Sequence, residues 1–301
     1  MPITKEQKIL RKYNLGSSDI AAILGRDPFK TAYDVWLDKT NKLPDDMEEN
    51  DAMQAGTLFE NGVLDWAEEN HLGALARNVH IKIEGLPIAS NVDAIAKSTG
   101  NPVEAKTSGL MSGIVKEVWG EPWTDDVPER VIIQSHVHMM AAKADTCHIP
   151  VFICGRGFVM FEVHRNQELC DIIAQRAEKF WNDHVLADVE PDNSLPSPNS
   201  AKKMKRQPNA IAYLTDDLVN RWLDAKASAA MAEEELQNAQ SQLLCALNNC
   251  EEGRCNAGII TFFEQSSKRL DSTRLKNEAP DIYKSFIKES RHRVLRYKAK
   301  E

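Results

Sequence analysis

The stretch from Ser90 to Ser108, SNVDAIAKSTGNPVEAKTS, restricts the folds open to this chain more than any other part of the sequence. Apolar residues lead into Asp93, a polar turn follows, and Glu104 and Lys106 then stand two residues apart. Side chains alternate between the two faces of a strand, so Glu104 and Lys106 are expected to share one face. The turn favours a close antiparallel pair, which returns Glu104 to the neighbourhood of Asp93. Taken alone, this pattern is more typical of a solvated strand face than of a functional site.

The size and composition of the chain are those of a folded cytoplasmic protein. With 301 residues, of which 42% are hydrophobic, it has room for one large domain or a main domain with an appendage. No apolar run reaches membrane-span length, and the N-terminal residues lack the apolar core of a signal peptide. The six cysteines form no CxxC pair and no zinc-ligand spacing, so we expect reduced thiols.

The net charge of −8 is unevenly distributed along the chain. Residues 1–194 carry the acidic excess, whereas residues 195–301 have a small excess of lysine and arginine. Clustered carboxylates in an acidic body are compatible with a site that depends on a bound cation. The same charge argues against a broad basic docking face, so any contact with DNA is expected to be local.

The segment 53–70 (MQAGTLFENGVLDWAEEN) has the periodicity of an amphipathic helix. Glu60 falls within its apolar arc, whereas the other acidic residues of the helix lie outside it. An unpaired carboxylate on an inward face is costly, so Glu60 requires either a salt-bridge partner or a metal ion.

The remaining periodicities predict an α/β core with a mixed central sheet flanked by helices. Short helices are expected at 17–24 and 32–40, a buried helix carrying Gln134 at 128–142, and a helix at 167–185. Strands are expected at 79–83, 88–94, 103–107, 149–154 and 157–163. We therefore expect a first domain at 1–190.

A linker and a second module are expected to follow this core. Residues 191–210 combine four prolines with a KKMKR cluster, which is typical of a linker or an exposed basic arm. In the module at 211–301, apolar residues recur from Leu218 to Cys250 at alternating spacings of four and three. This pattern predicts a long heptad helix that packs against another helix, within or between subunits. A strand at 258–264, a helix at 272–288 and a basic strand at 291–300 complete an α+β appendage.

Glu60, Asp93 and Glu104 are expected to converge at one sheet edge, with Lys106 beside them. Three carboxylates at one place repel one another unless they are protonated or neutralised by a cation. Oxygen ligands of this kind suit Mg²⁺ or Mn²⁺, and one or two such ions promote phosphodiester hydrolysis. The compact ammonium of Lys106 suits a role in holding the attacking water or offsetting charge on phosphorus.

With these pieces assembled, the chain resembles the YqaJ-type viral recombinase nucleases, relatives of the lambda-type phage exonucleases in the PD-(D/E)xK superfamily. The resemblance covers about the first 190 residues. It rests on an ordered set: Arg11 with GSSD (16–19), GTLFE (56–60), the strand ending at Asp93, EAK (104–106), Trp119, and PERVIIQ (128–134). Two departures are an altered turn at 90–94, without the usual proline and glycine, and Val131 where an aromatic residue is usual.

The resemblance implies a restriction-endonuclease-like core and a role for each matching residue. Asp93, Glu104 and the Ala105 carbonyl would bind one or two Mg²⁺ or Mn²⁺ ions, with Glu60 on the second-metal side or through water. Lys106 would position the nucleophile and Gln134 would orient water or substrate. By the same resemblance, a DNA 5′-phosphate would be bound by Arg11, Ser17 and Ser18, and Trp119 is a candidate DNA contact.

The family further implies a metal-dependent exonuclease that digests linear double-stranded DNA, 5′ to 3′, and leaves 3′ overhangs. A single-strand annealing recombinase would then use these overhangs, and the enzyme would be a homo-oligomer, as in the ring-forming relatives. The setting would be the host cytoplasm if a phage or prophage encodes the chain. Two alternatives stay open: an endonuclease acting on internal or branched DNA, and a non-catalytic module that binds DNA or a recombination partner.

Overall fold

A computed structural model describes residues 12–43, 51–109, 118–204, 210–248, 250–256, 258–264 and 272–285, and residues 266, 287 and 297 singly. The chain divides into two compact units, residues 1–206 and 207–301. The boundary falls near the end of the stretch predicted as a linker. Part of that stretch packs on the first unit. Ser194 Oγ accepts a hydrogen bond from the Tyr33 N–H, and the Ser197 N–H donates one to the Asp34 carboxylate.

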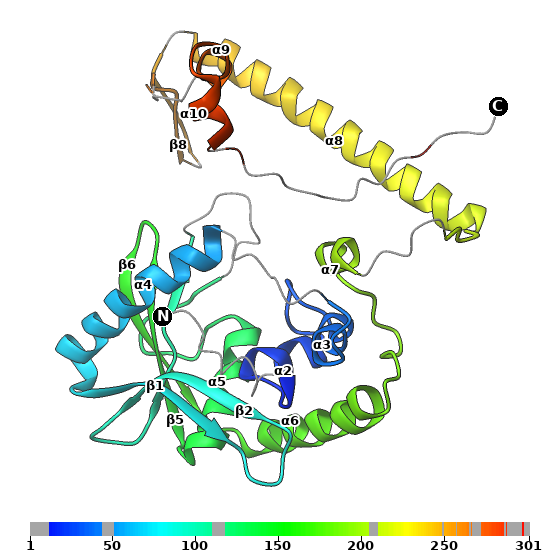
Figure 1. Cartoon of the computed structure of the whole chain (residues 1–301). Helices are drawn as coiled ribbons and strands as arrows, with labels where there is room; N and C mark the ends of the chain where they lie inside the picture. The colour runs from blue at the N-terminus through cyan, green and yellow to red at the C-terminus, as the bar shows by residue number, and fades with distance from the viewer. Residues whose placement is uncertain are drawn as a thin grey trace. The chain divides into compact units, whose positions relative to one another are not determined.

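A six-stranded mixed sheet forms the centre of the first unit (Figure 1). Its strands are β1 (Leu75–Lys82), β2 (Ala89–Ala96), β3 (Pro102–Val103), β4 (Lys106–Ser108), β5 (Thr146–Ile153) and β6 (Gly157–His164). β1 pairs with β2 and β2 with β3 in antiparallel fashion, β3 and β4 both run parallel to β5, and β6 is antiparallel to β5. The predicted fold class is therefore confirmed.

Helices pack around the sheet. They are α2 (Ser17–Ile23), α3 (Ala32–Lys39), α4 (Asp51–Ala67), α5 (Glu129–Ala142) and α6 (Gln167–Phe180), with π-helical turns η1 (Glu68–Leu72) and η2 (Trp181–Leu186) extending α4 and α6. A short helix, α7 (Pro198–Lys203), lies within the predicted linker. Along β5, Val151 packs in a cluster with Val131 of α5, whereas the next residue, Phe152, stacks on Phe59 of α4. Alternation along the strand thus places α5 and α4 on opposite faces of β5.

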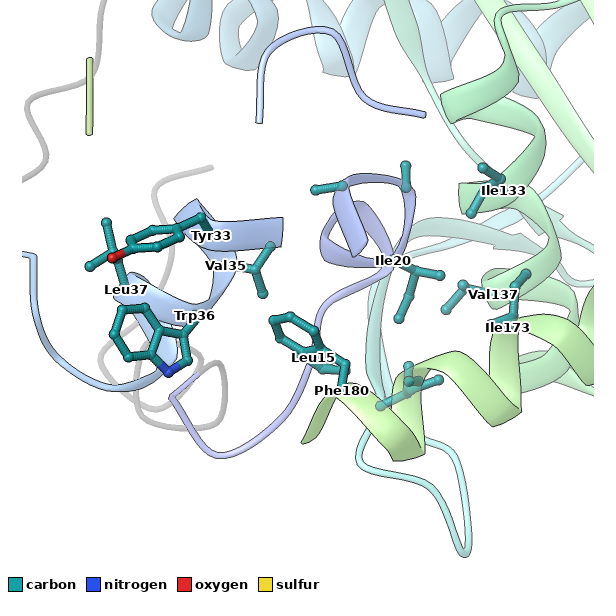
Figure 2. Packing of buried hydrophobic residues seen from close by; sticks show 14 residues of the cluster. Leu15, Ile20, Tyr33, Val35, Trp36, Leu37, Ile133, Val137, Ile173 and Phe180 are labelled. Atoms are coloured by element: carbon teal, nitrogen blue, oxygen red, sulfur yellow. The ribbon is translucent and has the colours of Figure 1, made fainter. Parts of the chain in front are cut away.

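The largest buried cluster joins α2, α3, α5 and α6 to the start of the sheet. Figure 2 shows Leu15 and Ile20 between the aromatic residues of α3 and the aliphatic residues of α5 and α6. Leu15 also forms a parallel bridge with Ile88, just before β2. This packing ties the N-terminal helices to the strand that carries Asp93.

Two details of the predicted strands are wrong. Asp93 lies inside β2 and not at its end. The predicted strand 103–107 is interrupted at Glu104 and Ala105, because the Ala105 N–H donates to the Asp93 carboxylate in place of a strand partner. The interruption separates β3 from β4 and leaves both residues beside Asp93.

The second unit contains α8 (Asp216–Leu247), the hairpin β7 (Glu252–Cys255) and β8 (Gly258–Thr261), and two short helices, α9 (Ser272–Glu278) and α10 (Pro280–Ser285). The predicted long helix is confirmed by α8. In place of one helix at 272–288, the structure has two helices that meet at Pro280. The strand β7 was not predicted. The predicted strand 291–300 lies outside the described residues, apart from Tyr297. Within the described part of the chain, no helix has both the length and the apolar character needed to cross a bilayer.

Candidate active site

A pocket with a volume of about 240 Å³ lies where α4, β2 and the interruption between β3 and β4 come together. The three carboxylates predicted to converge all line it. The full lining is Gly56, Glu60, Asp93, Glu104, Ala105, Lys106 and Thr107. The structure thus places in one pocket every acidic residue, and the lysine, that the sequence singled out for chemistry.

Asp93 is held in the pocket by a backbone contact. Its Oδ2 accepts a hydrogen bond from the Ala105 N–H at 2.9 Å. Burial raises the pKa of Asp93 well above its ordinary value, and the nearby carboxylate of Glu104 raises it further. A cation between these two acids would relieve that repulsion, so the electrostatics of the pocket favour a positively charged ligand.

Glu104 is the most enclosed acid of the site, with only 3% of the residue exposed. Its Oε1 accepts from the Lys106 ammonium and, at 2.7 Å, from the Gln134 side-chain amide of α5. Gln134 in turn accepts from Lys106 at 3.1 Å, which closes a ring of three side chains. Burial alone would raise the pKa of Glu104, but the Lys106 ammonium and His138 hold it well below its ordinary value. Glu104 is therefore an ionised carboxylate near neutral pH.

The second oxygen of Glu104 faces His138, which is also on α5. The His138 Nε2 lies 2.8 Å from Oε2 of Glu104, although the alignment of the two groups falls outside hydrogen-bond geometry. The other ring nitrogen, Nδ1, is 2.6 Å from the buried hydroxyl of Ser90 on β2. His138 was not among the residues predicted to form the site, although it follows Gln134 by four positions in the sequence. That spacing on one helix face was the signal that it shares the neighbourhood of Gln134.

The donor chemistry of the pocket fits a divalent metal ion that prefers oxygen. Asp93, Glu104, Glu60 and the Ala105 carbonyl are all hard oxygen donors. Within the described ranges, however, no three His, Cys, Asp or Glu side chains are grouped closely enough to bind a metal as they stand. Because Lys106 contacts Glu104, a metal ion would compete with its ammonium for that carboxylate.

Of the residues predicted to bind a 5′-phosphate, the two serines lie outside the pocket. Ser17 is buried and Ser18 is half-buried at the start of α2, and neither lines the pocket. At this helix start the Asp19 carboxylate accepts a hydrogen bond from the Gly16 N–H and forms ion pairs with Lys30 and Lys39. Arg11 lies outside the described residues. Phosphate binding by these residues stays a prediction.

Trp119, the candidate DNA contact, packs into the core. Its ring lies 5.3 Å from that of Phe161, centroid to centroid, and its indole N–H is buried. Trp123, four residues further on, is 52% exposed. Of the two tryptophans, Trp123 has the surface that a stacked base would need, so the contact assigned to Trp119 also stays a prediction.

The residues of the pocket fall within a part of the chain that is similar to a known protein family. Residues 8–145 match the model of the YqaJ-like viral recombinase domain. The chain is 28% identical over 300 residues to the YqaJ protein of Bacillus subtilis (strain 168), covering 96% of this chain and 92% of that protein.

Two solved structures are similar to part of the chain. One is an alkaline exonuclease from Laribacter hongkongensis, with 14% identity, a TM-score of 0.48, and coverage of 62% of this chain and 94% of that chain. The other is a phage-related exonuclease from Haemophilus somnus 129PT, with 16% identity, a TM-score of 0.41, and coverage of 60% and 99%.

Proposed function

Because residues 8–145 match the model of the YqaJ-like viral recombinase domain, we propose that this protein is a metal-dependent deoxyribonuclease that digests linear double-stranded DNA from its ends. The proposed polarity is 5′ to 3′, which leaves 3′ single-stranded overhangs for recombination by a strand-annealing partner. The observation that carries the proposal is the pocket itself. Asp93 from β2, Glu104 from the interruption between β3 and β4, and a third acid and a lysine meet there.

The arrangement supports hydrolysis of a phosphodiester bond. Asp93, Glu104 and the Ala105 carbonyl would hold Mg²⁺ or Mn²⁺, with Glu60 facing the same pocket. When bound, such an ion supplies Lewis-acid polarisation and neutralises charge on the phosphate. The Lys106 ammonium stands at the same pocket wall, where it would orient the attacking water and offset the negative charge that develops on phosphorus.

Gln134 supports both of these groups. Its amide nitrogen donates to Glu104 and its oxygen accepts from Lys106. This bidentate contact fixes the lysine relative to the carboxylate before substrate arrives. Because the lysine is already oriented, no free energy is spent on reorienting it as the transition state forms.

The experiment that tests the proposal follows one labelled linear duplex with a 5′-phosphate or a 5′-hydroxyl, in Mg²⁺ or in EDTA. Lys106→Ala should lower the rate about 100-fold or more, because it removes the ammonium that would orient the attacking water and offset charge on phosphorus. Lys97→Ala is the matched control, since Lys97 is an exposed lysine in the turn of the same hairpin and does not line the pocket.

Each alternative function predicts a different result in this assay. Cleavage of a covalently closed circle would assign an endonuclease. Binding of DNA with no cleavage of either substrate would assign a non-catalytic module. Equal rates for Lys106→Ala and Lys97→Ala would refute the role given to the pocket.

A further inference from the structure

In the part of the chain that the structure describes, most residues of the long helix α8 are exposed. Every residue from Asp216 to Leu247 is exposed except Val219, Trp222, Leu223 and Leu247. Leu247 is covered because it packs over Gly253 of β7, where a side chain would meet it at 2.7 Å. The helix is about 48 Å long at 1.5 Å per residue, and its other large apolar side chains are exposed or half-buried among the described residues.

Four of these large side chains and five alanines form one continuous seam, whereas Met231 and Leu244 lie outside it. Alternating spacings of four and three residues, the heptad repeat of a coiled coil, connect its members without a break. We name as the α8 seam the set Leu218, Trp222, Ala225, Ala229, Ala232, Leu236, Ala239, Leu243 and Ala246. Leu218, Leu236 and Leu243 are 50%, 51% and 41% exposed. A seam of nine positions that stays this exposed is suited to packing against a second helix.

We propose that the α8 seam pairs with the same seam of a second copy of this chain, in antiparallel orientation. The charges that flank the seam favour this occupant. A parallel, in-register pair would place Arg221 beside Lys226 of the other copy, two like charges. An antiparallel pair instead brings Lys226 beside Glu233 of the other copy. Two-fold symmetry forms that favourable contact twice.

The sizes of the seam residues fit the same register. With the helices centred between Ala230 and Met231, Trp222 lies opposite Ala239 and Leu236 lies opposite Ala225. Each of these two large side chains then meets an alanine, as close interdigitation of two helices requires. At both ends of the seam, Leu218 meets Leu243. The register that pairs Lys226 with Glu233 therefore also places Trp222 and Leu236 opposite alanines. An apolar stripe that arose by chance would not be expected to meet both conditions in one register.

This pairing is independent of the proposed nuclease activity, because it involves only the second unit. It is tested on the full-length protein by measuring mass in solution, with sedimentation or light scattering, across a range of protein concentrations. The wild type is expected to contain an even number of chains. Lys226→Glu and Glu233→Lys each create two like-charge contacts and should raise the dissociation constant about 10-fold, whereas the double variant, Lys226→Glu with Glu233→Lys, should restore it.

The chain offers a closely matched control. Glu234→Lys makes the same charge change one residue along the helix, on the side that faces away from the seam, and should leave the mass unchanged. Because Lys226, Glu233 and Glu234 are all exposed, none of the variants should disturb folding, which circular dichroism checks.

Three outcomes would overturn the proposal. The first is a wild-type monomer at tens of micromolar, which would mean that the seam serves the chain's own first unit or a different protein. The second is an oligomer that neither single variant weakens, which would place the interface elsewhere. The third is a double variant as weak as the singles, which would rule out the antiparallel register.

Discussion

Replacement of Asp19 by asparagine tests most directly how this fold tolerates buried charge. The Asp19 side chain is 3% exposed, and its two oxygens lie 2.9 Å from the Lys39 ammonium and 2.6 Å from that of Lys30. The Lys39 side chain is itself only 1% exposed. Asparagine keeps the size of the side chain and removes the charge, so Lys39 loses its buried counter-ion. Breaking a buried ion pair from one side costs about 3–5 kcal/mol, which is a large part of the stability of a domain.

The loss should depend on pH in a specific direction. Burial alone would raise the pKa of Asp19, but the Lys30 and Lys39 ammonium groups and the Gly16 N–H hold it well below its ordinary value. A carboxyl whose pKa is lower in the folded than in the unfolded state contributes stability above its unfolded pKa, about 3.9, and loses that contribution as the pH falls. The difference between wild type and Asp19→Asn should therefore be full at pH 7 and shrink steadily from about pH 5 downward.

Urea unfolding followed by circular dichroism at pH 7 and at lower pH measures both effects. Asp38→Asn is the matched control, because Asp38 lies 3.4 Å from the same Lys39 ammonium but its side chain is 55% exposed. It should cost less than about 1 kcal/mol, as exposed pairs do. Equal losses for Asp19→Asn and Asp38→Asn, or a loss at Asp19 that does not change with pH, would refute the argument from burial.

Two further predictions concern buried groups. His138→Leu should weaken Mn²⁺ binding, measured by calorimetry, by about 10- to 100-fold, because it removes the group that faces the second oxygen of Glu104. His136→Leu, on the same helix but bonded to backbone away from the pocket, should leave that affinity unchanged, and equal affinities for both variants would contradict the prediction. Burial raises the pKa of the Cys147 thiol, so iodoacetamide should modify Cys147 only after unfolding. The exposed Cys245 should react in the native protein. Rapid modification of Cys147 in the native protein would show that its burial is transient.

The sequence alone determined the class of fold and the identity of the candidate site. Apolar periodicity located α2, α3 and α5 to within a residue or two, because each buries one face and the period of that face is visible in the chain. Two acids and a lysine around one polar turn predicted that Asp93, Glu104 and Lys106 would meet, because a tight turn leaves the returning strand little freedom of register. All three line one pocket.

Only the tertiary structure decided how those groups are held. The break between β3 and β4 arises because the Ala105 N–H donates a hydrogen bond to Asp93, twelve residues earlier. The strand propensity of the local sequence does not predict that contact. His138 lies 2.8 Å from Glu104, 34 positions earlier in the chain. Periodicity reports which face of an element is apolar, but not which polar group that face will meet. That choice depends on contacts between segments far apart in sequence, and folding alone brings those segments together.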